Sequence, residues 1–164
     1  MTTTRPMPFE TADFKRALGQ FATGVTVVTT KGAQGGPLGL TVSAFASVSL
    51  EPPLVLVSID NRSEVHGGFE ASGLFAVSVL AEHQQEISQR FAFGVEKFDA
   101  SLVLGAHGMY LVPGALAHIE CRVGAAHVAG DHTIYLGEVL WLEARPGRPL
   151  VYHASRYAAL GDPA

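Results

Sequence analysis

The chain has 164 residues, a net charge of −4 and a single cysteine, a combination that excludes several classes of protein. A negative chain offers no basic surface for nucleic acid or anionic lipid, and one cysteine provides neither an internal disulfide nor a cysteine-based metal site. Apolar residues make up 48% of the chain, yet no run approaches the roughly 18 residues of a membrane-spanning helix. We therefore expect no nucleic-acid or membrane partner, and a homodimer that buries the apolar excess.

The N-terminal region is expected to be an arm that precedes a single domain. Residues 1–10 are polar and contain proline, which predicts a flexible arm, and residues 11–164 are expected to form one domain. No apolar segment follows the first basic residue, so the N-terminus does not resemble a signal peptide. A cytoplasmic location fits this feature and the lone Cys121.

Helix and strand patterns follow in chain order. A stripe of apolar residues at helical spacing begins after Thr11, the expected N-cap, and Gly24 is the expected stop. β-Branched residues predict a strand over 25–30, and a glycine-rich hairpin loop over 31–37 leads into the next strand.

Later in the chain, two helices are expected with strands around them. Residues 63–73 predict a short helix that Gly67 and Gly68 weaken, and residues 81–92 predict a second helix. Residues 93–108 show no clear period, which predicts an irregular segment.

A long strand is expected to begin near residue 117. Period-two alternation there predicts that Ile119, Cys121 and Val123 point inward and that His118 and Glu120 point outward. A strand interior with apolar neighbours indicates that Cys121 is a buried structural residue and not a nucleophile.

The order of these elements predicts a mainly β fold. Sequential strands with short glycine-containing connections favour an antiparallel barrel of about six strands with a few short helices. No G-x-G-x-x-G follows a strand, and neither G-x-x-x-x-G-K-[ST] nor H-E-x-x-H occurs. A Rossmann dinucleotide site, a P-loop and a helical zinc site are therefore excluded, and no metal site is expected.

Hydroxyl side chains recur along the otherwise apolar stretch 39–59. They are Thr41, Ser43, Ser47, Ser49 and Ser58. Two interpretations fit this pattern: the hydroxyls line a solvated sheet face, or they form the wall of a pocket for a flat, polar ligand.

Three stretches together resemble the flavin reductase-like family, the NAD(P)H:flavin oxidoreductases that serve two-component monooxygenases. They are "FATGVTVVTT" with "GLTVSAFASVSLEPPLVLVSI", then "FAVSVLAEHQQEISQRFA" with Lys97 and Phe98, and "GDHTIYLGEV" with "PLVYH" and Tyr157. The resemblance extends over residues 11–158 in the family's order and spacing. It implies an FMN-binding split β-barrel and a homodimer with each flavin near the subunit boundary.

The resemblance also implies which residues bind the flavin, FMN or FAD. The predicted flavin-binding residues are Thr41, Ser43, Ala44 and Ser47 for the ring and ribityl chain, Ser58, Asn61, Arg62 and Ser63 for the phosphate, and Arg90, Phe91, Lys97 and Phe98 for the tail. Many family members have serine at position 44, so only the backbone of Ala44 is available here. Arg62 has an alternative as an ion-pair partner of Asp60 or Glu64, and Arg90 and Phe91 also fit an amphipathic helix.

The nicotinamide nucleotide is expected at the "GDH" turn. His132 resembles the family histidine that lies over the flavin ring, and is the predicted catalytic residue; its alternative is an ordinary turn residue. His153 and Tyr157 are candidates for the nucleotide end.

The function implied is NAD(P)H-dependent reduction of FMN or FAD, with diffusible reduced flavin passed to a partner monooxygenase. No arginine cluster marks a 2′-phosphate site, which favours NADH over NADPH. Two alternatives stay open: a split barrel that retains its flavin and acts on another substrate, and a non-enzymatic flavin- or haem-binding module.

Overall fold

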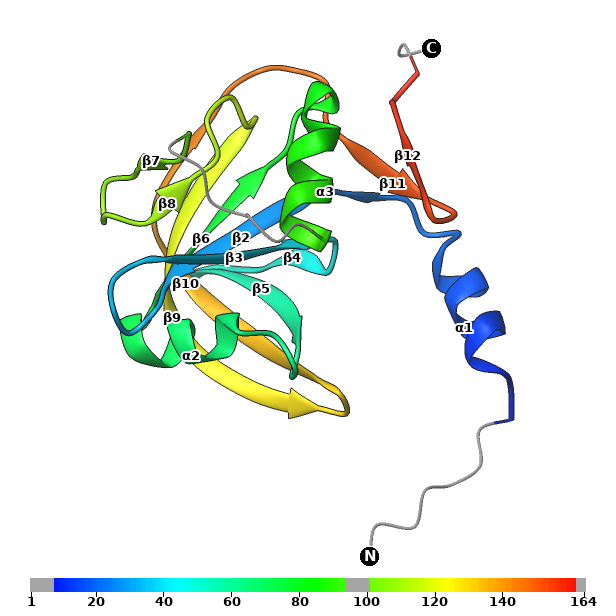
Figure 1. Ribbon diagram of the computed structural model, residues 1–164, viewed down its shortest axis with the longest axis horizontal. Helices are drawn as coiled ribbons and strands as arrows, with labels where there is room; N and C mark the ends of the chain where they lie inside the picture. Colours follow the sequence, from blue (N-terminus) through cyan, green and yellow to red (C-terminus); the bar gives the residue numbers. More distant parts are fainter. Residues whose placement is uncertain (1–7, 94–100, 162–164) are drawn as a thin grey trace, which may run out of the picture.

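The computed structural model describes residues 8–93 and 101–161, and its ribbon is a curled sheet with helices at its surface (Figure 1). The helices are α1 (Thr11–Leu18), α2 (Val65–Ser72), the 3-10 helix η1 (Glu82–Gln84) and α3 (Gln85–Phe93). The strands are β1 (Thr23–Gly24), β2 (Thr26–Lys31), β3 (Pro37–Val42), β4 (Phe45–Leu50), β5 (Pro53–Asp60), β6 (Leu74–Val79), β7 (Val103–Leu104), β8 (Tyr110–Leu111), β9 (Ala117–Ala129), β10 (His132–Ala144), β11 (Val151–His153) and β12 (Arg156–Ala158).

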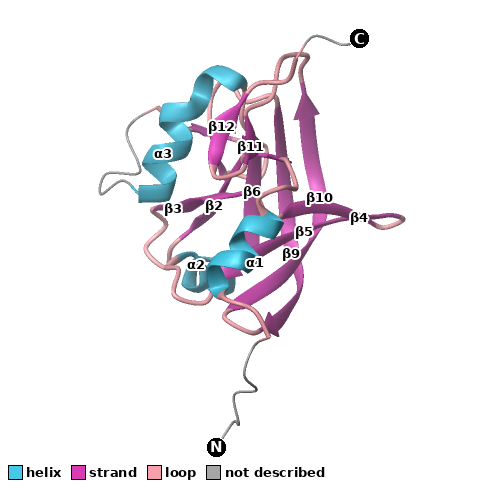
Figure 2. Cartoon of the chain, turned by 90° about the vertical axis from the view of Figure 1, so that its right-hand side faces the viewer, coloured by secondary structure: helices cyan, strands magenta, loops and turns pink. Residues whose placement is uncertain are grey.

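Seven of the strands form one antiparallel sheet, in the order β3-β2-β6-β9-β10-β5-β4. Its two edge strands, β3 and β4, are consecutive in the chain and are separated only by Ser43 and Ala44. The sheet must therefore curl until its edges meet at this connection, and β3 indeed approaches β5. The mainly β, antiparallel fold expected from the sequence is confirmed (Figures 1 and 2).

The core lies inside this curled sheet and beneath α2. Alternate residues of β5 are buried, which matches the period of a strand with one face toward the core. The Phe69 ring of α2 packs 5.2 Å from the Phe75 ring and edge-on, at 4.5 Å, against the Tyr135 ring. A Cβ atom at Gly68 would lie 2.4 Å from Cγ2 of Thr30, so the glycine expected to weaken this helix is what lets it pack closely on β2.

The first helix differs from the expectation. It ends at Leu18 with Gly19 as its C-cap, and Gly24 lies in β1, where it pairs with Val151. None of the residues of α1 is buried, and the Phe14 side chain is 50% exposed. Within the described residues, no helix has the length and apolar content to cross a membrane.

Two residues of β9 that were expected to point outward are buried. His118 is 2% exposed and Glu120 is 0% exposed. The segment through β7 and β8 folds over this side of β9, and the amide N–H groups of His107 and Met109 donate to the Glu120 carboxylate at 3.0 and 3.1 Å. The alternation of the two faces was predicted correctly, but both faces of the strand are covered. The Glu120 carboxylate tolerates its burial because its oxygens accept hydrogen bonds.

A substitution at Gly137 tests how tightly the sheet packs on its core. A Cβ atom there would lie 2.3 Å from Cζ of Phe75 and 2.9 Å from Cβ of Cys121. We expect Gly137→Ala to lower the free energy of unfolding by about 1–3 kcal/mol, because overpacking forces neighbours out of place. Chemical denaturation measures this change. Gly124→Ala in the paired strand is the control, since its nearest neighbour would be the Leu136 carbonyl oxygen at 3.5 Å; equal losses in the two variants would contradict the packing argument.

Candidate functional site

The connection between the two edge strands is exposed and has a free backbone donor. Ser43, Ala44 and Ser47 are all exposed. The Ser58 amide donates to the Ala44 carbonyl at 3.1 Å, and the Phe45 amide donates to the Ser43 carbonyl at 3.0 Å, which fixes the turn against β5. Within residues 8–93 and 101–161, the Ala44 N–H has no acceptor. A free amide and two small hydroxyls can bond the polar edge of a flat ring without crowding it.

Thr41 joins this connection to α3 and to the C-terminal sheet. Its hydroxyl donates to the Ser88 carbonyl at 2.6 Å, and the Ser88 hydroxyl is 2.8 Å from the hydroxyl of Tyr157. Two predicted site residues from distant parts of the sequence are thus brought together by Ser88, which the sequence reasoning did not single out. The Thr41 hydroxyl already has its acceptor, so its contribution here is to position α3.

The other residues predicted for the flavin tail and nucleotide end have mixed positions. Phe91 is 3% exposed and packs in a cluster with Val27, Leu80 and Leu150. Arg90 lies on the same helix and is half-buried. His153 is exposed in β11, next to the hairpin turn that leads to Tyr157 in β12. Lys97 and Phe98 lie outside the described residues.

Asn61 holds the Gly-Asp-His turn against the end of β5. Its amide N–H donates to the Asp131 carbonyl at 2.9 Å, and its side-chain Nδ2 donates to the Gly130 carbonyl at 3.3 Å. The Thr133 hydroxyl donates to Oδ1 of Asn61 at 2.7 Å. The predicted phosphate-binding segment and the predicted nicotinamide turn are therefore neighbours, with His132 paired opposite Asp60 in the ladder.

Arg62 forms a two-pronged ion pair with Asp60. Its Nε donates to Oδ1 at 3.0 Å and its Nη2 to Oδ2 at 2.6 Å, while its backbone N–H also donates to Oδ1 at 2.9 Å. These hydrogen bonds hold the pKa of Asp60 far below its usual value. The pairing that the sequence offered as an alternative for Arg62 is present, yet its side chain is 88% exposed and open to a competing anion.

His132 is oriented by its neighbour in the turn. Its Nδ1 lies 2.8 Å from Oδ1 of Asp131, and the hydrogen bond from His132 lowers the pKa of Asp131. Because a carboxylate only accepts, Nδ1 carries the proton, and in the neutral ring Nε2 is left as the acceptor. The His132 side chain is 43% exposed, so its free edge is open to a ligand.

The start of α2 is anchored to the same corner. Ser63 donates its amide to the Asp60 carbonyl at 2.9 Å, and its hydroxyl accepts from the Val65 amide at 3.4 Å. His66 donates through Nε2 to the Asp60 carbonyl at 2.8 Å, while the Tyr135 hydroxyl, whose pKa is raised by burial, donates to Nδ1 at 2.6 Å. Sequence reasoning missed His66, because Tyr135 is 69 residues away and the bond to Asp60 is made to a backbone carbonyl, which no residue pattern indicates.

The described residues contain no cluster of three or more histidine, cysteine or acidic side chains that could hold a metal ion. Cys121 is buried, and desolvation raises its pKa to about 12. At neutral pH it is a thiol and therefore a poor nucleophile.

Comparison with known proteins identifies the family. A model described as the flavin reductase like domain matches residues 18–161. The chain belongs to the flavin reductase-like family. The Ser43–Ala44 connection and the Gly-Asp-His turn, which belong to the stretches that carry the resemblance in the sequence, are two corners that β5 links in this structure.

Named relatives in this family are similar over most of their length. The chain is 46% identical over 145 residues to the FMN reductase (NADH) SmoA of Agrobacterium fabrum, covering 88% of this chain and 83% of the relative. It is 39% identical over 155 residues to HsaB of Rhodococcus jostii, the reductase subunit of a flavin-dependent monooxygenase, covering 90% and 76%. Among solved structures, the NADH:FAD oxidoreductase SgcE6 of Streptomyces globisporus C-1027, in complex with NAD and FAD fragments, has a TM-score of 0.89, 38% identity and 98% coverage of both chains.

Proposed function

We propose that the protein is an NADH-dependent flavin reductase that supplies diffusible reduced FMN or FAD to a partner monooxygenase. The observation that carries the proposal is the position of the Gly-Asp-His turn, which Asn61 holds beside the segment predicted to bind the flavin phosphate. Family membership and the activities in the names of the relatives support it. An acceptor flavin and a nicotinamide donor need neighbouring sites, and this corner provides them.

The flavin is bound along a line that begins at the connection between the edge strands. Ser43, the amide of Ala44, and Ser47 contact the polar edge of the ring, since they are exposed and turned away from the core. Ser58, Asn61, Arg62 and Ser63 follow in the chain and supply donors for the phosphate. Arg90, Lys97 and Phe98 border the tail, and Phe91 fixes α3 from the core.

Hydride passes from C4 of the nicotinamide to N5 of the flavin when the two rings stack at about 3–3.5 Å. The residues need only hold the two rings and leave one flavin face open. His132, with Nδ1 bound to Asp131, presents its other edge to the nicotinamide nucleotide, and Tyr157 and His153 contact the nucleotide end. This role requires no acid–base pair.

Replacing His132 tests the nicotinamide site. We expect purified protein to oxidise NADH only when FMN or FAD is added. We expect His132→Ala to raise the KM for NADH about tenfold, the loss of roughly 1.4 kcal/mol of binding, and to change the KM for flavin much less. Steady-state absorbance at the NADH band measures both constants. His83→Ala removes an exposed histidine from η1 and serves as control; an unchanged NADH KM in His132→Ala would sink the assignment.

Removing the competing carboxylate tests Arg62 as a phosphate ligand. Asp60→Asn ends the ion pair, so the guanidinium is freed for a phosphate, and we expect FMN to bind about two- to fivefold more tightly. Riboflavin, which has no phosphate, should bind as before, and Arg62→Ala should bring FMN affinity down toward that of riboflavin. Quenching of flavin fluorescence measures these affinities.

The control for that experiment is Asp13→Asn, which removes the same charge from the exposed Asp13–Arg16 pair on α1. Equal effects of Asp60→Asn on FMN and riboflavin would contradict the phosphate role of Arg62. That result would not contradict the proposed reductase activity, because NADH oxidation tests the activity in a separate experiment.

The reductase is proposed to act as a homodimer in the cytoplasm. Leu54 and Leu56 of β5 and Ile134 and Leu136 of β10 alternate with core residues and lie partly exposed on the outer face of the sheet. A partner copy would cover this apolar face. A reducing compartment suits the lone free Cys121.

Light scattering tests the homodimer. We expect the mass of two chains for the parent protein and of one chain for Leu56→Glu, because a carboxylate on this face opposes burial in the interface. Leu160→Glu changes an exposed leucine near the C-terminus and should leave the dimer intact. A monomeric parent protein would overturn the proposal.

A further inference from the structure

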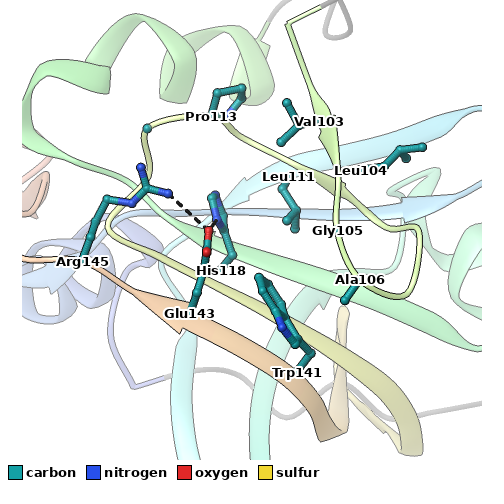
Figure 3. Close-up of a pocket in the computed structure, with 11 residues that line it drawn as sticks. Val103, Leu104, Gly105, Ala106, Leu111, Pro113, His118, Trp141, Glu143 and Arg145 are labelled. Atoms are coloured by element: carbon teal, nitrogen blue, oxygen red, sulfur yellow. Dashed lines mark hydrogen bonds and ion pairs between the residues drawn. The ribbon is translucent and has the colours of Figure 1, made fainter.

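A pocket lies far from the proposed flavin corner. Its volume is about 540 Å³, and it opens between the β7 segment and the last residues of β10 (Figure 3). His132 begins β10 and Glu143 lies eleven residues later, so at about 3.3 Å per residue the two sites are separated by roughly 36 Å along the strand. The pocket has the size of a small-molecule site, and nothing in the proposed hydride transfer uses it.

One wall of the pocket is a hydrogen-bonded chain of three polar side chains, those of His118, Glu143 and Arg145. Nε2 of His118 lies 2.7 Å from the Val112 carbonyl, which only accepts, so this nitrogen carries a proton. Nδ1 of His118 lies 2.8 Å from Oε1 of Glu143, and Nη2 of Arg145 donates to the same oxygen at 3.2 Å. The hydrogen bond from His118 lowers the pKa of Glu143, which favours the carboxylate form of this side chain.

Arg145 brings a positive charge to this wall, and its ion pair with Glu143 engages only part of the guanidinium. Only one nitrogen of the Arg145 side chain has a partner within the described part of the chain, and the side chain is 48% exposed. Glu120, behind Gly105, is fully buried and engaged by amide groups, so its oxygens do not face the pocket as free acceptors. The guanidinium therefore has donors left for an anion.

The opposite part of the pocket is apolar and flat. Trp141 stands beside the charged wall, and Val103, Leu104 and Ala106 of the β7 segment line the same pocket (Figure 3). Val103 is 48% and Leu104 64% exposed, whereas Leu111 is buried. An indole ring and aliphatic residues that line one pocket offer an apolar surface to a planar hydrocarbon ring.

We propose that this pocket binds a small aromatic carboxylate, with its ring between Trp141 and the β7 side chains and its carboxylate on Arg145. The anion binds through the guanidinium donors that Glu143 leaves unused. Glu143, held by His118, fixes the direction of the guanidinium. The site is separate from the flavin corner and independent of the proposed function.

Trp141 is the single tryptophan of the chain, so its fluorescence reports this pocket directly. Titration of the full-length protein with benzoate should change the emission in a saturable way, with a Kd of about 1 mM or lower. Benzamide has the same ring without the charge and should bind at least about tenfold more weakly. His132→Ala should bind benzoate like the parent protein, because its site lies elsewhere.

Arg145→Gln should weaken benzoate binding about tenfold, while Arg122→Gln should not. Arg122 lies on β9 and pairs with Glu138 on β10, the strand that also carries Glu143, so its replacement is a matched loss of one exposed arginine–glutamate pair. Thermal melting checks that both variants are folded. Absence of a saturable change, equal binding of benzamide, or benzoate binding by Arg145→Gln at the strength of the parent protein would each overturn the proposal.

Discussion

The constraint on which the rest of the structure depends is the two-residue connection between β3 and β4. These strands are the opposite edges of a seven-stranded sheet, so Ser43 and Ala44 hold the two edges together. Edge strands leave backbone donors and acceptors unpaired, which is a liability where they are exposed. Here the unpaired amide of Ala44 lies in a short, turned segment that cannot accept another strand, so it is available to a small polar ligand.

A second constraint follows from the first, because β5 pairs with β4 on one side and β10 on the other. The same strand therefore contacts the edge connection near Ser58 and the Gly-Asp-His turn at Asp60. Asn61 continues the strand with three hydrogen bonds to the turn and its flank. The two corners are fixed relative to each other by one strand, which is the geometry that reaction between two bound rings requires.

Local patterns predicted the strands well, since alternation and β-branched runs depend on neighbours in sequence. They failed where a distant segment decides the outcome. His118 and Glu120 were assigned to the outer face because the sequence does not show that the β7–β8 segment covers it. The sequence predicted that α1 ends at Gly24, but the helix has Gly19 as its C-cap. Gly24 instead lies in β1, where it pairs with Val151, more than a hundred residues away in the chain.

The candidate site shows the same difference between features that local sequence patterns predict and features that distant segments decide. Asn61, Arg62 and His132 each belong to one short motif, so the sequence could propose them as site residues, whereas not all of the residues that orient them could be predicted. Ser88 links Thr41 to Tyr157 through contacts that span 47 and 69 residues, and no spacing rule reports such a link. The Asp60–Arg62 pair could be predicted because its members are only two positions apart in the sequence. In the proposed site this pair would also favour release of the flavin. An exposed guanidinium that already has a carboxylate partner gains little when it exchanges it for a phosphate, so a phosphate would be held weakly there. Weak retention is what a carrier that leaves for another enzyme needs, and a carboxylate two residues from the arginine supplies it without altering the ring-binding wall.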